Sequence, residues 1–272
     1  MNTEIFNSHV HTNNSEDGKA SAEEMCLAAC RAGLSGITVT DHCNIATFIS
    51  DNSYSRIKKS VSDAERMKEK YADNLFVGVG AEIGEAIWNP GYTARILQLA
   101  DFDAILASVH RVRHESIKGS FSRVDFSVLA DKQINEYMDR YFDDVYETAL
   151  SCDFDILSHL TIPLRYITGI YGRHVCLDGF AKKTDKILQS LIERGKALEL
   201  NTSEIGNIGF MPDAEILRRY RCLGGELVSV GADSHVTEKI SYGIDEGLHC
   251  LKECGFDYYV YYRQRTAIKV LI

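Results

Sequence analysis

The chain has little proline, with 3 residues in 272, and it contains no low-complexity tract. Collagen-like, linker and disordered classes are therefore excluded. It also has no run of about 18 apolar residues, so neither a membrane span nor a membrane partner is expected. The first residues, Met-Asn-Thr-Glu-Ile-Phe, contain no basic segment and no apolar core, so no signal peptide is predicted.

Positive charge is also scarce. The chain has 30 Lys and Arg residues against 39 Asp and Glu residues, a formal net charge of −9. Nucleic-acid binding usually requires a basic face, so we expect no nucleic-acid partner, and a proofreading nuclease is disfavoured. A local cluster of metal ions or arginines can still bind a small phosphorylated molecule despite the overall negative charge.

The 8 cysteines include no Cys-x-x-Cys motif and no spacing typical of a disulfide framework. Isolated thiols usually pack as small core residues. Free thiols indicate a reducing compartment, so the sequence predicts a cytoplasmic location.

Short apolar runs alternate with longer amphipathic segments along the whole chain. The expected strands are residues 5–8, 36–40, 75–79, 104–107, 154–157, 197–200, 227–230 and 258–261. The expected helices are residues 21–33, 55–71, 131–150, 183–194, 212–224 and 241–254. This alternation is typical of parallel βα units, and continuously apolar strands fit a sheet buried on both faces.

No Gly/Ser-rich linker divides these units, so we predict one α/β domain over residues 1–272. A closed barrel is favoured over an open doubly wound sheet, because polar residues follow almost every strand and a barrel brings strand ends to one rim. The aperiodic segment 111–131 is predicted to be a loop over the mouth. The aromatic tail from 258 onwards is predicted to be an edge strand packed on the barrel, with a partner interface as the alternative.

Imidazole and carboxylate side chains follow the expected strands. In chain order they are His9, His11, Asp17, Asp41, His42, Glu82, His110, His159, Asp233 and His235. Such side chains bind zinc, manganese and iron in hydrolytic sites. Because ten candidates exceed the needs of one ion, the sequence predicts two or three divalent metal ions (Zn, Mn or Fe) at the C-terminal rim.

A multinuclear centre can generate hydroxide at neutral pH and hold the oxygens of a phosphate. The predicted reaction is therefore metal-assisted hydrolysis of a phosphoester. Hydrolysis of an amide or ring amide remains open on the chemistry of the ligands alone.

Four motifs carry a resemblance to a known family. They are His9-Val10-His11, Thr40-Asp41-His42, Ser108-Val109-His110 and Asp233-Ser234-His235. In type and order they resemble the motifs of the PHP (polymerase and histidinol phosphatase) superfamily. The resemblance implies a distorted (β/α)7, TIM-like barrel with up to three metal ions at the C-terminal rim.

The resemblance also implies ligand sets for the three ions. The first set is His9, His11, Glu82 and Asp233; the second is Glu82, His110 and His159; the third is Asp17, His42 and His235. Glu82 would bridge the first two ions. Many phosphatases of the family have a histidine where Asp17 stands in this chain.

Within the superfamily the chain looks most like the monofunctional histidinol-phosphatase branch. Its length, the lack of a fused polymerase domain and the tail motifs Asn201-Thr202-Ser203 and Gly231-Ala232-Asp233 are the basis for this. The branch implies hydrolysis of L-histidinol phosphate to L-histidinol and phosphate, in histidine biosynthesis, by attack of a metal-bridging hydroxide. A nucleotide or sugar phosphate as substrate, and a non-catalytic metal-binding domain, are the alternatives. The sequence makes no prediction of oligomeric state.

Further residues are candidates for catalysis and for binding the substrate. Asp233 would orient the hydroxide or accept its proton, and His42 or His235 would protonate the leaving alkoxide. Arginine suits phosphate because of its fork of donors. The candidates for substrate contact are Arg165, Arg111, Arg113 and Asn201. Glu85 is expected to be a solvated loop acid.

Overall fold

The computed structural model of the protein describes residues 4–115 and 117–272. Its main feature is a curved parallel sheet in the order β1-β2-β4-β5-β6-β7-β8, with β3 paired to β4. The strands are β1 (Phe6–Val10), β2 (Gly36–Val39), β3 (His42–Asn44), β4 (Phe76–Gly84), β5 (Ala104–Ser108), β6 (Ile156–Leu157), β7 (Ala197–Asn201) and β8 (Val228–Gly231).

The two edges of this sheet approach each other. Val10 and Ser234 form a parallel bridge, and the backbone N–H of His11 donates to the carbonyl of Ser234 at 2.9 Å. The sheet is thus a nearly closed barrel of seven strands, and the expected distorted (β/α)7 fold is confirmed.

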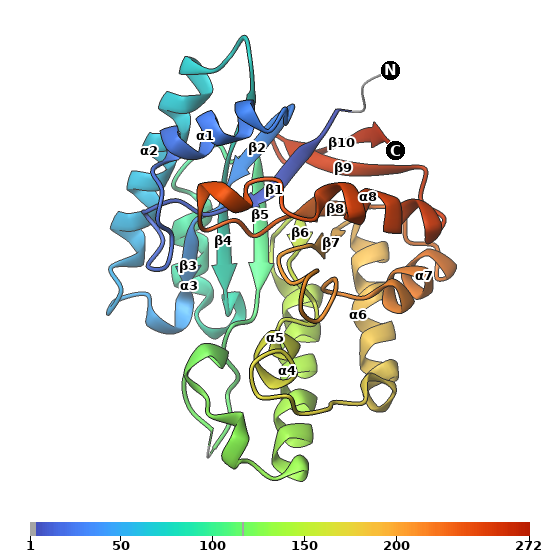
Figure 1. Cartoon of the computed structure of the whole chain (residues 1–272). Coiled ribbons are helices and arrows are strands. Elements are labelled where there is room, and N and C mark those ends of the chain that lie inside the picture. Colours follow the sequence, from blue (N-terminus) through green and yellow to red (C-terminus); the bar gives the residue numbers. More distant parts are fainter. Residues whose placement is uncertain (1–3, 116) are drawn as a thin grey trace.

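Helices surround the sheet, as Figure 1 shows. They are α1 (Ala22–Arg31), α2 (Ser53–Lys70), α3 (Pro90–Leu97), α4 (Asp131–Ser151), α5 (Pro163–Ile167), α6 (Ala181–Arg194), α7 (Ala214–Cys222) and α8 (Ile244–Glu253). Short 3₁₀ turns lie at η1 (Ile45–Thr47), η2 (Ala86–Trp88), η3 (Phe121–Arg123), η4 (Phe126–Val128), η5 (Leu177–Phe180) and η6 (Thr237–Lys239). Every residue of β1, β2 and β5 to β8 is buried, as expected for a sheet covered on both sides.

Local capping signals account for the starts of some helices. Ser21 and Glu24 form the expected capping box before α1. Asp213 caps α7 from outside the helix by accepting from the N–H groups of Glu215 and Ile216. The short helices α3 and α5 were not predicted, because eight and five residues are too few for a clear apolar periodicity. The segment 111–131 is mostly a loop, as predicted, with η3 and η4 inside it.

The prediction for the aromatic tail needs correction. Strands β9 (Tyr258–Arg263) and β10 (Thr266–Leu271) form a separate antiparallel hairpin rather than an edge strand of the barrel sheet. The hairpin packs against the amino ends of the barrel strands. The N–H of Gln264 donates to Asp103 before β5, and the hydroxyl of Tyr262 donates to the Asp155 carbonyl before β6. It therefore closes the end of the barrel opposite the rim.

No helix in the described ranges has the length and apolar character needed to cross a membrane.

We expect Tyr259→Phe to lower the free energy of unfolding by about 1–3 kcal/mol. The buried hydroxyl of Tyr259 accepts from the Phe6 N–H and donates to the Glu4 carbonyl, both at 2.9 Å, and phenylalanine leaves both groups without this partner. Tyr258→Phe is the matched control, because its hydroxyl bonds Glu226 at the surface; it should change stability by less than about 0.5 kcal/mol. Equal effects in urea unfolding would refute the anchoring role of Tyr259.

Candidate metal centre

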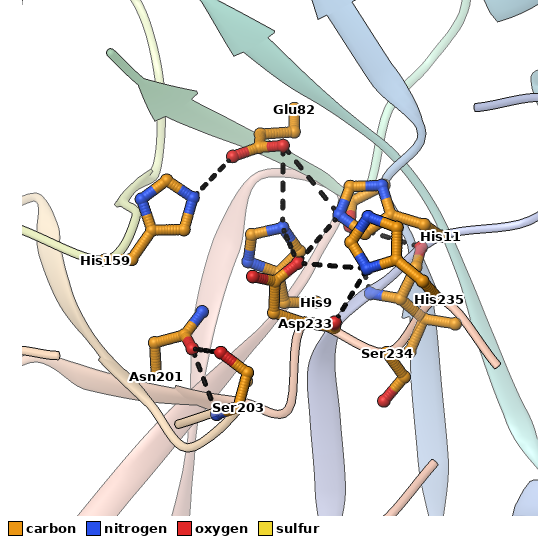
Figure 2. A network of polar contacts seen from close by, with 12 residues as sticks. His9, His11, Glu82, His159, Asn201, Ser203, Asp233, Ser234 and His235 are labelled. Atoms are coloured by element: carbon orange, nitrogen blue, oxygen red, sulfur yellow. Dashed lines mark hydrogen bonds and ion pairs between the residues drawn. The ribbon is translucent and has the colours of Figure 1, made fainter. Parts of the chain in front are cut away.

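Imidazoles and carboxylates converge where the barrel strands end. His9 lies in β1 and His11 follows it, His42 begins β3, and Glu82 lies in β4. Strand β5 is followed by His110, and strand β6 is followed by His159. Strand β8 is followed by Asp233 and His235. Figure 2 labels His9, His11, Glu82, His159, Asp233 and His235 and shows their side chains pointing toward one another.

The carboxylate of Glu82 lies at the centre of this cluster and is fully buried. Its Oε1 atom lies 2.9 Å from His159 Nε2 and 3.3 Å from His110 Nε2. Strand β4 continues to Gly84, beyond the predicted 75–79, and this extension places Glu82 level with His42 of β3.

The other oxygen of Glu82 faces a second group of histidines. Oε2 lies 2.5 Å from His42 Nδ1, 3.7 Å from His9 Nε2 and 3.8 Å from His11 Nε2. The two oxygens of one buried carboxylate thus contact five histidines. This is the arrangement expected of a ligand that bridges two cations.

Asp233 completes the inner group. Its Oδ1 atom lies 3.2 Å from His11 Nε2, 3.7 Å from His9 Nε2 and 3.6 Å from His235 Nδ1. The backbone of Asp233 has φ +49°, a left-handed conformation that aspartate adopts more readily than most residues.

An outer group lies closer to solvent. Asp17, whose side chain is 61 % exposed, has Oδ1 3.3 Å from His235 Nε2 and 3.6 Å from His42 Nε2. His42 therefore contacts Glu82 through one ring nitrogen and faces Asp17 through the other. It therefore lies within reach of the second expected site as well as in the third.

Among the residues that the structure describes, three sets of ligand atoms are compact enough to hold a cation. They are His9, His11 and Glu82; His42, Glu82 and His110; and His11, His42 and His235, with the atoms of each set within 4.8 Å of one another. Each set includes residues of at least two expected ligand groups, so the groups adjoin one another.

The electrostatics of the cluster suit a cation. Burial acts to raise the pKa of Glu82, but His110, His42 and His9 outweigh burial and hold it well below its usual value. Burial and the neighbouring His42 and His235 lower the pKa of His11 well below its usual value, so its ring is neutral and can offer a lone pair.

Two of the inward nitrogens make no hydrogen bond. The Nε2 atoms of His9 and His11 are buried and make no well-formed hydrogen bond, although carboxylate oxygens lie 3.2–3.8 Å away. Buried polar atoms without partners are rare, and a bound ion is one of the ordinary explanations. The residues present therefore fit divalent cations.

A cavity opens above the cluster and is lined by Asp17, His42, His110, His159, Asp233 and His235. Arg165 also lines it, with Nη2 2.8 Å from Asp233 Oδ2, and so does Arg111. Arg113 lies outside this cavity and stacks 4.9 Å from the centre of the Trp88 ring.

Asn201 is also outside the cavity. It is fully buried, and its side chain donates to Glu199 and accepts from the N–H and hydroxyl of Ser203. Of the four candidates for substrate contact, the structure therefore brings only the arginines at 165 and 111 to the cavity.

Glu85 is not the solvated loop acid that we expected. It is fully buried, with φ +53°, and its Oε1 accepts from the backbone N–H of His110 at 2.7 Å. Burial raises its pKa. The left-handed turn after β4 directs the side chain inward, and nothing in the local sequence specifies that turn.

Two further carboxylates support the cluster from below. Asp41, counted among the candidate ligands, instead accepts from the N–H and hydroxyl of Thr12 and the hydroxyls of Ser15 and Ser60, at 2.6–2.7 Å. Glu199 of β7 was missed altogether. An ionisable residue in the middle of the apolar run Ala-Leu-Glu-Leu is the signal that could have identified it.

A parallel α/β barrel whose C-terminal rim gathers imidazoles and carboxylates around a buried carboxylate is typical of one class, that of metal-dependent barrel enzymes. The chain belongs to the PHP domain family, whose model matches residues 7–203.

Curated relatives cover almost the whole chain. A probable histidinol-phosphatase from Thermotoga maritima is 28% identical over 260 residues, which is 93% of this chain and 94% of that protein. A histidinol-phosphatase from Lactococcus lactis is 24% identical over 264 residues, 91% and 90% of the two chains.

Solved structures show the same fold. The histidinol phosphate phosphatase of Lactococcus lactis, crystallised with zinc, L-histidinol and phosphate, matches 98% of this chain and 99% of its own with a TM-score of 0.78 and 20% identity. The structure of a putative histidinol phosphatase from Listeria monocytogenes matches 89% of this chain and 99% of its own, with a TM-score of 0.73 and 18% identity.

We expect the purified protein to bind about two to three divalent ions per chain, because the ligand atoms form several adjoining sets. Removing them with a chelator should lower the melting temperature, since the ions bind only the folded chain. Elemental analysis and thermal unfolding measure the two effects. This expectation would be contradicted if the protein bound no zinc, manganese or iron and its melting temperature did not change when a chelator was added.

Proposed function

We propose that this chain is a metal-dependent phosphomonoester hydrolase that converts L-histidinol phosphate and water to L-histidinol and phosphate, a step of histidine biosynthesis. The observation that carries the proposal is the convergence of five histidines on the two oxygens of buried Glu82. Membership of the PHP domain family and histidinol-phosphatase relatives that match more than nine-tenths of the chain support it.

The proposed ligand sets are those that the family resemblance implies. The first is His9, His11, Glu82 and Asp233; the second is Glu82, His110 and His159; the third is Asp17, His42 and His235. Zinc, manganese and iron are the candidates for the ions. Ions held there would neutralise the phosphate oxygens and lower the pKa of water toward neutrality.

Arg165 is the proposed phosphate-binding side chain. It lines the cavity, and its fork of donors is held between Asp233 and Glu204, with Nη2 2.8 Å and Nε 3.2 Å from the two carboxylates. These contacts hold the guanidinium at the wall of the cavity. A phosphate entering the cavity would accept hydrogen bonds from the donors that face the opening.

Proton transfer is assigned to residues on the cavity wall. Asp233 lies between His11 and Arg165, where its Oδ1 can orient the attacking water and accept its proton. His42 and His235 both line the cavity and both face Asp17, so whichever ring keeps a nitrogen that is not bound to an ion can donate a proton to the leaving alkoxide oxygen.

We expect metal-loaded protein to release phosphate from L-histidinol phosphate with a kcat/KM of about 10⁴ M⁻¹s⁻¹ or more. Activity toward p-nitrophenyl phosphate and a nucleoside monophosphate, assayed in parallel, should be far lower. The Glu82→Gln substitution should lower kcat/KM for L-histidinol phosphate at least about 10³-fold, because one amide cannot replace a bridging carboxylate. Turnover of the other esters alone would overturn the substrate, and no turnover with any of the three metals would overturn the catalytic role.

We expect Arg165→Lys to lower kcat/KM for the phosphomonoester by about 10–100-fold, because lysine keeps the charge but loses the planar fork. Arg113→Lys is the matched control, since Arg113 lies outside the cavity and should change kcat/KM less than about twofold. Metal content is measured on both variants, because Arg165 also contacts Asp233. An Arg165→Lys variant with unchanged kinetics, or one no weaker than the control, argues against phosphate binding by Arg165.

A further inference from the structure

We propose that Glu199 is a positioning residue that orients ligands of two metal sites at once. The inference rests on the proposed function. Glu199 lies in the middle of β7, beneath the cluster, and its side chain is 1 % exposed. It lines no part of the cavity above the cluster and belongs to none of the compact ligand sets.

One oxygen of Glu199 orients His9. Oε1 lies 2.6 Å from His9 Nδ1, a short charge-assisted hydrogen bond. A proton held on Nδ1 leaves the lone pair on Nε2. That nitrogen is the one that faces the cluster, 3.7 Å from both Glu82 Oε2 and Asp233 Oδ1. The carboxylate thereby selects the tautomer of His9 that can bind a cation.

The other oxygen of Glu199 orients His159 through its backbone. Oε2 accepts from the His159 N–H at 2.7 Å. His159 has φ +22°, a conformation that residues with a side chain rarely adopt and that surrounding contacts must maintain. In this conformation His159 Nε2 lies 2.9 Å from Glu82 Oε1, whereas His9 faces the other oxygen, Oε2. Asn201 Nδ2 donates to the same Oε2 atom at 3.1 Å and steadies the carboxylate.

The neighbouring strand leaves room for this contact. A Cβ atom at Gly231 of β8 would lie 2.4 Å from Glu199 Oε1 and 2.6 Å from His9 Cβ, closer than atoms can pack. Glycine at this position therefore lets the carboxylate and the imidazole meet beneath the cluster. Glycine in β8 is thus compatible with the contact between Glu199 of β7 and His9 of β1.

An isosteric substitution separates this role from simple packing. Glutamine has one acceptor oxygen, and its NH₂ group is a donor. In Glu199→Gln the amide can accept from His9 or from the His159 N–H but not from both, so one of the two loses its partner. Because the two ligands belong to different proposed sites, the change should weaken metal binding although no ligand is removed.

The test measures the apparent affinity of the full-length chain for Zn²⁺ and for Mn²⁺ by competition with a chromogenic chelator at fixed pH. We expect the Glu199→Gln variant to bind Zn²⁺ and Mn²⁺ about 10–100-fold more weakly than the wild type does. Glu199→Asp should show a similar loss, since a side chain one methylene shorter cannot reach both partners. Melting of the metal-free proteins establishes that each variant is folded.

Asp155→Asn is the matched control for a buried carboxylate that bonds backbone. Asp155 accepts from the Ile105 N–H at 2.8 Å and pairs with Arg265 at the opposite end of the barrel. Its loss should lower the melting temperature and leave metal affinity unchanged.

The possible outcomes distinguish a failure of the proposed function from a failure of the positioning role of Glu199. If the wild type binds neither metal, the proposed function itself fails. If the wild type binds and a folded Glu199→Gln or Glu199→Asp variant binds within about twofold of it, Glu199 has no positioning role. If Asp155→Asn loses as much affinity as the Glu199 variants, the effect is one of general stability and the proposal is overturned.

Discussion

The structure depends on the burial of one carboxylate. Glu82 has no exposure to solvent, and such a group is costly to bury unless positive charge or strong donors surround it. The barrel meets this requirement with imidazoles from strands far apart in sequence, which contact both oxygens of Glu82. Only a parallel barrel, with all its strand ends at one rim, brings those side chains together. The same arrangement presents convergent lone pairs to divalent cations. The histidines that stabilise buried Glu82 therefore also form a candidate active site.

A second layer of carboxylates holds the backbone that carries the ligands. Glu85 accepts from the N–H of His110, Glu199 from that of His159, and Asp41 from that of Thr12, which follows His11. Two of these residues, Glu85 and His159, have a positive φ, as does Asp233 at the same rim. Strained conformations of this kind persist where surrounding contacts maintain them, and they concentrate at functional sites. The rim therefore combines fixed side chains with fixed loops, which favours a preorganised site.

The sequence predicts the barrel well, because apolar runs and helix caps are local signals. The strand ends at His9, His110 and Asp233 follow from those signals together with the family motifs. The features that the sequence does not predict are those that depend on tertiary contacts. Glu85 and Glu199 face inward because of a turn and a neighbouring strand, and the site of Arg113 depends on the ring of Trp88. The hairpin of β9 and β10 was mistaken for an edge strand, because alternation along one strand does not reveal which sheet it joins.

The central claim is that Glu82 bridges two cations within this rim. Anomalous diffraction from crystals soaked with Zn²⁺ or Mn²⁺ tests it most directly, because it locates the ions without reference to any assay. The account predicts a peak on each side of Glu82, about 2.0–2.2 Å from a carboxylate oxygen, one beside His9 and His11 and the other beside His110 and His159. Peaks only at surface carboxylates, with none within coordination distance of Glu82, would contradict it.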